Sequence, residues 1–131
     1  MSDTTTRGIR VQVTSTYLPE RSSPRDCQYL FAYHIRISNV GSETAQLVSR
    51  EWIITTADGE VERVKGPGVV GEQPVLKPGE SFTYTSGAPL AAPSGVMVGT
   101  YSMTRIDTGE MFDIAVPAFP LDSPYVTRRA N

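Results

Sequence analysis

Three glycines in the middle of the chain have the spacing of a phosphate-binding loop. Gly66, Gly68 and Gly71 match G-x-G-x-x-G, a pattern whose last glycine opens a pyrophosphate-binding helix in dinucleotide sites. Pro74 and Pro78 follow closely, and a proline in a helix interior costs roughly 3 kcal/mol. The sequence therefore predicts a glycine-rich loop between extended segments rather than a helix N-terminus.

This loop has two interpretations. Consecutive backbone amides can form a concave anion site without a helix, and Arg63, Lys65 and Lys77 lie near enough in sequence to add positive charge. Glu72 opposes that charge. Alternatively, the glycines supply unusual backbone angles or allow close backbone approach, which is the commoner use of glycine and the one we favour. The candidate anion- or pyrophosphate-binding residues of the first interpretation are Lys65, Gly66, Gly68, Gly71 and Lys77.

The chain offers little for catalysis or metal binding. Cys27 is its single cysteine and His34 its single histidine, and the alternation of a regular strand would place them on opposite faces. We therefore expect an ordinary half-buried thiol, no catalytic residues and no enzyme activity. A transition-metal site needs several Cys or His ligands, so we predict no metal and no cofactor. The candidate magnesium ligands are expected to be solvated charges in hairpins, and these are Asp58, Glu60, Glu62, Asp107, Glu110 and Asp113.

Composition narrows the class of protein and its surroundings. The 131 residues suit one domain, and 12 Lys and Arg against 14 Asp and Glu give a net charge of −2. This balance does not suggest the positive face that nucleic-acid binding requires. No apolar run approaches the roughly 20 residues of a membrane span. A polar N-terminus without an apolar signal core and a single cysteine favour a soluble protein of the reducing cytoplasm.

Apolar and polar residues alternate through nearly the whole chain, and no long stretch has the period of a helix. This pattern predicts an all-β domain, an antiparallel β-sandwich of about seven strands of the fibronectin type III or immunoglobulin type. We assign the single domain to residues 1–131, with a core of about 9–124 and flexible tails at 1–8 and 125–131. The expected strands are 9–17, 29–37, 45–56, 61–65, 81–86, 96–106 and 111–116.

The second expected strand is the best candidate for a central one. Phe31, Tyr33 and Ile35 alternate along one face, which we expect to belong to the core. His34 takes the more polar face, where it is expected to hydrogen-bond locally. A single histidine without a partner is a weak sign of catalysis.

The third expected strand places an arginine on the same face as a tryptophan. Val48, Trp52 and Ile54 alternate there, and Arg50 shares their face. Trp52 is predicted to be a core residue rather than a ligand platform. The Arg50 guanidinium is expected to lie over the indole edge or to pair with a carboxylate on the next strand.

The C-terminal part of the chain is rich in proline. After Pro117 the sequence is poorly suited to a central strand. We expect this segment to lie along the surface with Phe119 and Leu121 tucked in. The last predicted strand therefore ends at residue 116.

Several separate motifs, in the right order, resemble the bacterial ApaG (CorD-like) family. The likeness spans roughly residues 9–124, the size of one complete domain. The order of the motifs makes the resemblance specific, whereas the glycine loop alone would not. The motifs lie in Phe31–Gly41, Ser49–Thr55, Gly66–Leu90, Gly99–Met103 and Phe112–Pro124.

The resemblance implies a fibronectin type III-like sandwich and a genetic link to cobalt resistance and magnesium efflux, and related domains are appended to eukaryotic F-box adaptors. It carries over no catalytic residues. The family's glycine loop has been suspected of pyrophosphate binding, and Gly66, Gly68 and Gly71 match that motif. We therefore predict a non-enzymatic interaction module with an unidentified protein partner, linked indirectly to cation transport. The alternative is a nucleotide- or pyrophosphate-binding protein, and the oligomeric state stays open, a homodimer included.

Overall fold

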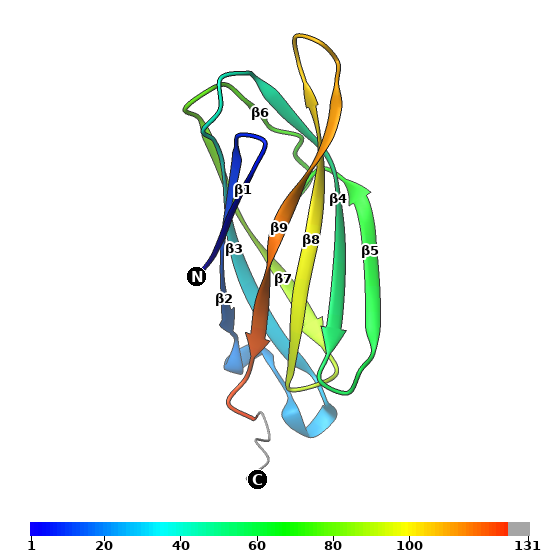
Figure 1. Ribbon diagram of the computed structural model, residues 1–131. Coiled ribbons are helices and arrows are strands. Elements are labelled where there is room, and N and C mark those ends of the chain that lie inside the picture. Colours follow the sequence, from blue (N-terminus) through cyan, green and yellow to red (C-terminus); the bar gives the residue numbers. More distant parts are fainter. Residues whose placement is uncertain (126–131) are drawn as a thin grey trace.

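Nine β-strands make up most of residues 1–125, the part of the chain that the computed structural model describes (Figure 1). Two 3-10 turns, η1 (Pro19–Arg21) and η2 (Pro24–Asp26), lie between β2 and β3. The prediction of an all-β fold is confirmed, although β1 and the two-residue β6 were not expected. The strands are β1 Ser2–Thr6, β2 Ile9–Tyr17, β3 Tyr29–Asn39, β4 Ala45–Thr56, β5 Val61–Pro67, β6 Val75–Leu76, β7 Ser81–Leu90, β8 Ser94–Arg105 and β9 Met111–Asp122.

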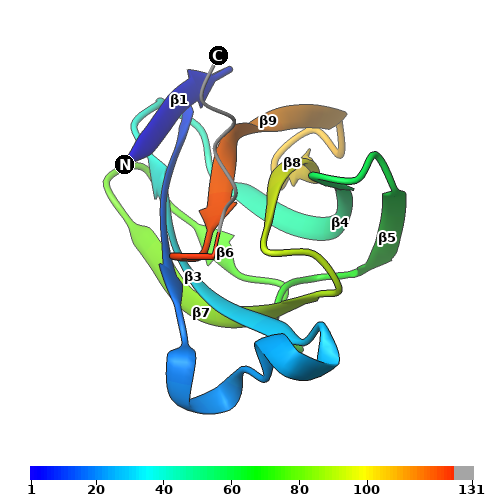
Figure 2. The ribbon, with the colours of Figure 1, turned by 90° about the horizontal axis from the view of Figure 1, so that it is seen from below.

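The strands form two antiparallel sheets packed face to face. One sheet has the order β1-β2-β3-β7, and the other has the order β5-β4-β8-β9 with β6 beside β4. Figure 2 looks along the sandwich and shows β9 near β1, with β5 and β7 away from that side. The predicted antiparallel β-sandwich is therefore confirmed. No helix within residues 1–125 is long and apolar enough to cross a membrane.

The core lies between the sheets and follows the alternation of β3. Phe31, Tyr33 and Ile35 are buried, as predicted, because every second side chain of a strand points to the same face. His34 points to the outer face, where its Nδ1 lies 2.7 Å from the Thr85 hydroxyl. The expected local hydrogen bond of this histidine is therefore present.

A bulge in β4 changes which residues enter the core. Leu47 pairs with Met103 and Ser49 with Ser102, so Val48 has no partner on β8. The extra residue shifts the alternation by one position, and Leu47 is fully buried whereas Val48 is only half-buried. The prediction that Val48 shares the Trp52 face is therefore wrong, but Trp52 itself is buried as expected.

The last strand continues through the proline-rich segment. β9 runs to Asp122, so the expected end at residue 116 is wrong. β9 is an edge strand of its sheet, and edge strands tolerate proline because one row of N–H groups needs no partner. A second bulge lies here, between the pairs Met97–Phe119 and Gly99–Val116. Phe119 and Leu121 are buried, as predicted.

The N-terminal residues are part of the sandwich rather than a tail. β1 pairs with β2, and the Ser2 hydroxyl donates to the Ala118 carbonyl at 3.0 Å. The Ser15 hydroxyl donates to the Pro120 carbonyl at 2.7 Å, which joins β2 to β9. The predicted flexible tail at 1–8 is therefore wrong, whereas positions 126–131 of the predicted C-terminal tail lie outside the described residues. Polar β1 closes the β1/β9 side of the sandwich.

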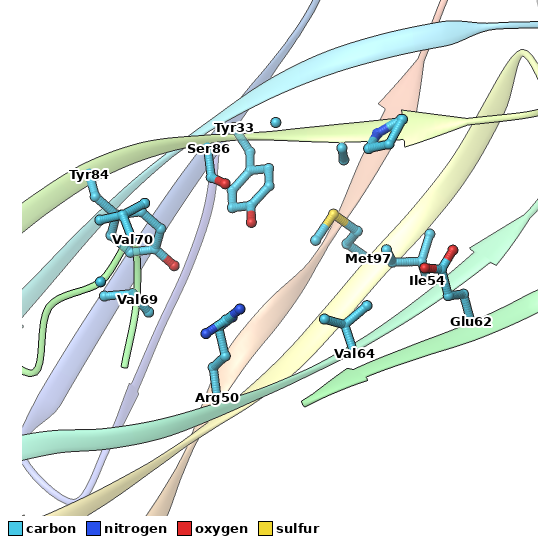
Figure 3. A pocket seen from close by; sticks show the side chains of 14 residues that line it. Tyr33, Arg50, Ile54, Glu62, Val64, Val69, Val70, Tyr84, Ser86 and Met97 are labelled. Atoms are coloured by element: carbon cyan, nitrogen blue, oxygen red, sulfur yellow. The ribbon is translucent and has the colours of Figure 1, made fainter. Parts of the chain in front are cut away.

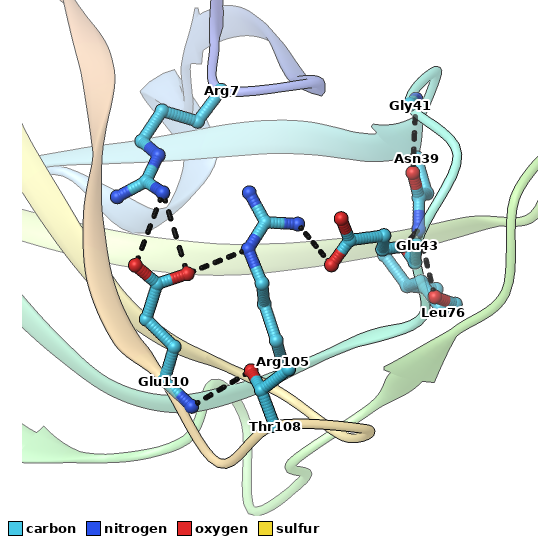
Figure 4. A network of polar contacts seen from close by, with 8 residues as sticks. All are labelled: Arg7, Asn39, Gly41, Glu43, Leu76, Arg105, Thr108 and Glu110. Carbon is cyan, nitrogen blue, oxygen red and sulfur yellow. Dashed lines mark hydrogen bonds and ion pairs between the residues drawn. The ribbon is translucent and has the colours of Figure 1, made fainter.

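A network of charged side chains joins three turns at one end of the sandwich (Figure 4). Glu110 accepts from Arg7 at 3.3 Å and from Arg105 at 2.9 Å, and Arg105 also pairs with Glu43 at 3.1 Å. The guanidinium carbons of Arg7 and Arg105 lie 5.0 and 4.8 Å from the Phe112 ring centroid. These hydrogen bonds hold the pKa of Glu110 below its usual range. Glu110 is thus an exposed hairpin charge, as expected, and it also belongs to an ion-pair network.

Candidate functional site

The glycine loop is a tight turn that uses most of its own amides. Val69 and Glu72 exchange two backbone hydrogen bonds of 2.8 Å each, and positive φ values of 44° at Val70 and 80° at Gly71 give the two central residues of a type I′ turn. The Gly68 amide donates to the Val48 carbonyl at 2.8 Å. Three amides of the loop are therefore bound to backbone carbonyls.

Each glycine of the motif has a geometric reason. A Cβ on Gly66 would come within 3.0 Å of the Arg50 guanidinium, and one on Gly68 would overlap the Glu72 carbonyl oxygen. Gly68 also has φ +59°, and Gly71 has φ +80° with open space around it. Positive φ disfavours other residues. The sequence pattern thus predicted a loop correctly, and its glycine positions serve backbone geometry and close approach.

The predicted anion-site residues do not converge on one point. Lys65 and Gly66 line a depression that also includes Glu51 and Asp113, whereas Gly71 lines a different cleft between the sheets. Gly68 and Lys77 line neither. Lys65 Nζ lies 3.8 Å from the carboxylate of Glu51. Anion binding by these residues stays a prediction. Three of the loop's backbone N–H groups already donate to carbonyls, so fewer remain for an anion.

The cleft between the sheets opens between β5 and β7 and has a volume of about 300 Å³. Figure 3 shows Arg50 rising from β4 toward Tyr33, Tyr84 and Ser86, which enter from the opposite sheet. The hydrophobic wall includes Ile54, Val64, Val69, Ala88 and Met97. The loop residues Val70 and Gly71 complete one end. The cleft thus combines an apolar wall with a few polar groups, as ligand sites do.

Arg50 is held by the loop instead of by the partners predicted for it. Its Nη1 donates to the carbonyls of Pro67 at 3.0 Å and Gly68 at 2.9 Å. Within residues 1–125 it has no carboxylate within 4.0 Å and does not stack on Trp52. Both expected contacts are wrong, because β4 and β5 bring the loop carbonyls nearer. Trp52 packs instead on Tyr33, with ring centroids 5.5 Å apart.

Two tyrosine hydroxyls meet in the interior beside the cleft. Tyr84 and Tyr101 are hydrogen-bonded to one another through their hydroxyls. Burial raises the pKa of both hydroxyls well above the usual tyrosine value, which the Arg50 charge opposes only weakly. Both tyrosines are therefore neutral at physiological pH, and Arg50 carries the positive charge of the cleft.

The strands on either side of the cleft have unpaired edges. Among the described residues, β7 pairs only with β3 and β5 only with β4. The Asn39 amide donates to the Glu80 carbonyl and the Thr56 amide to the Glu60 carbonyl. Since hydrogen-bonded pairs alternate along an antiparallel ladder, odd-numbered residues of β5 and β7 direct their backbone groups away from the sheet. Both strand prolines, Pro67 and Pro89, occupy such outward positions.

The two edges differ in their protection. β5 carries Glu62, Arg63 and Lys65, and charged side chains on an edge strand discourage pairing with other chains. β7 is ten residues long and has no charged residue. The predicted strand 81–86 was too short, because pairing with β3 continues to Leu90. Sequence reasoning missed this edge, since strand order decides it.

The single cysteine lies away from this cleft. Cys27 is exposed and follows η2 with φ 55°, a left-handed conformation. The prediction of a half-buried thiol is wrong, because β3 begins only at Tyr29. Within residues 1–125 no three His, Cys, Asp or Glu side chains lie close enough together to hold a metal ion.

The two packed sheets and the cleft at their open side define an antiparallel β-sandwich domain. The family model of the ApaG domain (DUF525) matches residues 19–105, and the chain belongs to the ApaG family. It is 57% identical to Protein ApaG of Paramagnetospirillum magneticum over 100% of both chains, and 55% identical to that of Rhodospirillum centenum over 96% of both. A crystal structure of a protein named ApaA from Bordetella pertussis superposes with a TM-score of 0.85 at 48% identity, covering 90% of this chain and 95% of that one.

Proposed function

We propose that the chain is a non-enzymatic protein-interaction module that binds an extended partner segment as an added strand along β7. The observation that carries this proposal is a ten-residue edge strand without a charged side chain, beside an open cleft. A strand that adds to an edge satisfies unpaired backbone groups and places alternate side chains in neighbouring pockets. The outward N–H groups of Thr83, Thr85 and Gly87 are the donors for that pairing.

The other edges are less suited to pairing. β9 lies against β1 and β2, and the hydrogen bonds of Ser2 on β1 and Ser15 on β2 join it to them. β5 is guarded by three charges and ends in Pro67. β7 carries only Pro89 as a barrier, near its C-terminal end. These contrasts favour β7 as the docking edge.

An interaction module also accounts for the expected link to cobalt resistance and magnesium efflux. A partner that belongs to a transporter or a regulator would produce such a phenotype without a metal ion bound to this chain. The cytoplasm is the compartment in which we place this interaction, in keeping with a single exposed cysteine.

A second candidate function is the binding of a nucleotide or pyrophosphate at the glycine loop. One observation favours it, the Arg50 guanidinium without a carboxylate partner in the described chain, next to the loop. The hydrogen bonds of Gly68, Val69 and Glu72 weigh against it, because they leave fewer amides for a phosphate. We therefore rank it second.

Thr83→Pro tests strand addition directly. This substitution removes one outward N–H group of β7, and prolines are tolerated on edge strands. Val61→Pro, which alters the outward edge of β5, is the matched control. Proteins captured from native lysate by the wild type and by Val61→Pro should be lost with Thr83→Pro, while circular dichroism stays unchanged. Equal capture by all three folded proteins would exclude β7 as the binding edge.

A further inference from the structure

The Arg50 guanidinium is held in place with part of its donor set unused. Nη1 makes two hydrogen bonds to loop carbonyls, at 3.0 and 2.9 Å. Gly66 leaves the space that the group occupies, since a Cβ there would come 3.0–3.2 Å from Nη1, Cζ and Nη2. Guanidinium groups have five N–H donors, and no hydrogen bond from Nη2 or Nε is made to residues 1–125, so these nitrogens keep donors for another acceptor. A guanidinium fixed in this way has lost much of its conformational entropy before any ligand arrives.

The two ends of the cleft carry opposite charges. Arg50 is the only cationic side chain among the lining residues, and Glu62 is the only acidic one. Arg50 lies opposite Gly66 and Ile54 lies opposite Glu62, so the backbone positions of the two charged residues are offset by roughly 13 Å along the strands. An anionic group is therefore favoured at the loop end of the cleft and disfavoured at the other end.

The size of the cleft suits a side chain. Its volume of about 300 Å³ is at the lower limit for sites that enclose a whole small molecule. Tyr84, Ser86 and Ala88 line the cleft from β7, so a strand added to that edge would lie beside them. Every second side chain of such a strand points to the cleft.

We propose that the Arg50 cleft selects, within a segment docked on β7, an aspartate or glutamate side chain, whose carboxylate accepts hydrogen bonds from the guanidinium. This inference rests on the proposed strand addition and names the partner's chemistry. Arg and carboxylate groups match in geometry, and such charge-assisted bonds are among the stronger hydrogen bonds in proteins. The partner segment is extended, with an acidic residue at a fixed position.

The test is a selection of phage-displayed random decapeptides against the immobilised full chain. The wild type and Glu60→Gln, a control at an exposed residue outside the cleft, should both select peptides with Asp or Glu at one fixed position. Arg50→Gln should lose that preference and bind a wild-type-selected peptide roughly 10- to 100-fold more weakly. The same peptide with Gln in place of its acid should bind wild type and Arg50→Gln about equally. Arg50→Lys is the second variant, to be used if Arg50→Gln fails to fold. It keeps the positive charge but lacks the planar guanidinium with its paired N–H donors, so it should bind the peptide more weakly than wild type.

Four results would overturn the inference. Selected peptides without an acidic residue at a fixed position would contradict the carboxylate selection by Arg50. If Thr83→Pro also abolishes the selection of these peptides, the proposed strand addition along β7 would still stand. Acidic peptides that bind Arg50→Gln as well as wild type would place the carboxylate contact elsewhere. No selected peptide at all would overturn both proposals. Saturable binding of sodium pyrophosphate that depends on Arg50, without any selected peptide, would assign the cleft to small anions.

Discussion

Gly66 and Arg50 are neighbours across the paired strands β4 and β5, and the missing side chain of Gly66 leaves the space that the Arg50 guanidinium occupies. Alanine at position 66 would push against Nη1 at 3.0 Å. Because φ at this position is not in the left-handed region, the effect of the substitution isolates that contact.

We predict that Gly66→Ala lowers the free energy of unfolding by about 1–2 kcal/mol, since the guanidinium must move and its bonds to the loop carbonyls weaken. Gly87→Ala is the matched control in another edge strand, with no non-neighbouring atom closer than 3.7 Å to an added Cβ. It should change stability by less than about 0.5 kcal/mol. Urea melts of both variants check the difference, and equal effects would contradict the packing role of Gly66.

Gly68→Ala should cost more than Gly71→Ala. Both positions have positive φ, but only at Gly68 would the new methyl group overlap the Glu72 carbonyl. We expect roughly 1 kcal/mol for Gly71→Ala from the backbone alone and at least about 2 kcal/mol for Gly68→Ala. Denaturant melts measure both values. A Gly68→Ala protein as stable as wild type would mean that the turn has another conformation.

Trp52→Ala should destabilise the protein by roughly 3–5 kcal/mol, the usual cost of truncating a large buried aromatic side chain. Trp52 is 3% exposed and packs on Tyr33, Tyr101 and Phe119. Val98→Ala, at a residue 38% exposed, is the control and should cost less than about 1 kcal/mol. A loss below about 1 kcal/mol for Trp52→Ala would identify Trp52 as a surface residue instead.

Glu110 should stabilise the protein at neutral pH and lose that effect in acid. Hydrogen bonds from Arg105 and Arg7 lower its folded-state pKa below the ordinary 4.5. A lowered pKa gives stability that is complete above the ordinary value and disappears as pH falls through the folded-state value. The melting temperature of wild type should therefore exceed that of Glu110→Gln at pH 7, and the difference should shrink below pH 4.5. A difference that is constant from pH 7 to pH 3 would contradict this account.

Calorimetric titrations with ATP, diadenosine tetraphosphate and pyrophosphate should be flat. The amides of Gly68, Val69 and Glu72 already donate to backbone carbonyls, and the predicted lysines lie apart from the cleft. Saturable binding that weakens with salt and is abolished by Gly68→Asp, with the fold intact by circular dichroism, would favour the nucleotide alternative.

Local pattern was enough to predict most of the fold. Alternation identifies the buried face of Phe31, Tyr33 and Ile35, because it depends only on the geometry of one strand. Val48 could not be assigned in this way, since a bulge depends on the partner strand β8. Polar β1 escaped notice for a similar reason: its stabilisation comes from contacts with distant residues, such as that between Ser2 and Ala118.

The candidate site was less predictable than the fold. The glycine pattern located a loop, but the role of Gly66 depends on Arg50, a residue whose contact with it requires the register between β4 and β5. Likewise, the sequence of β7 does not reveal that it is an edge strand. Strand order follows from packing of the whole chain, which no local period encodes.

The hydrogen bond between Ser2 and Ala118 joins residues 116 positions apart. Ribosomes add about 5–20 residues per second, so the first strand waits roughly 6–23 s for its partner during translation. Over that interval β9 is missing from the opposing sheet, so the side of the sandwich formed by β1 and β2 lacks its contacts with β9. Closure of this side is therefore a late event during synthesis, because contacts between residues far apart in sequence form only after both have been made.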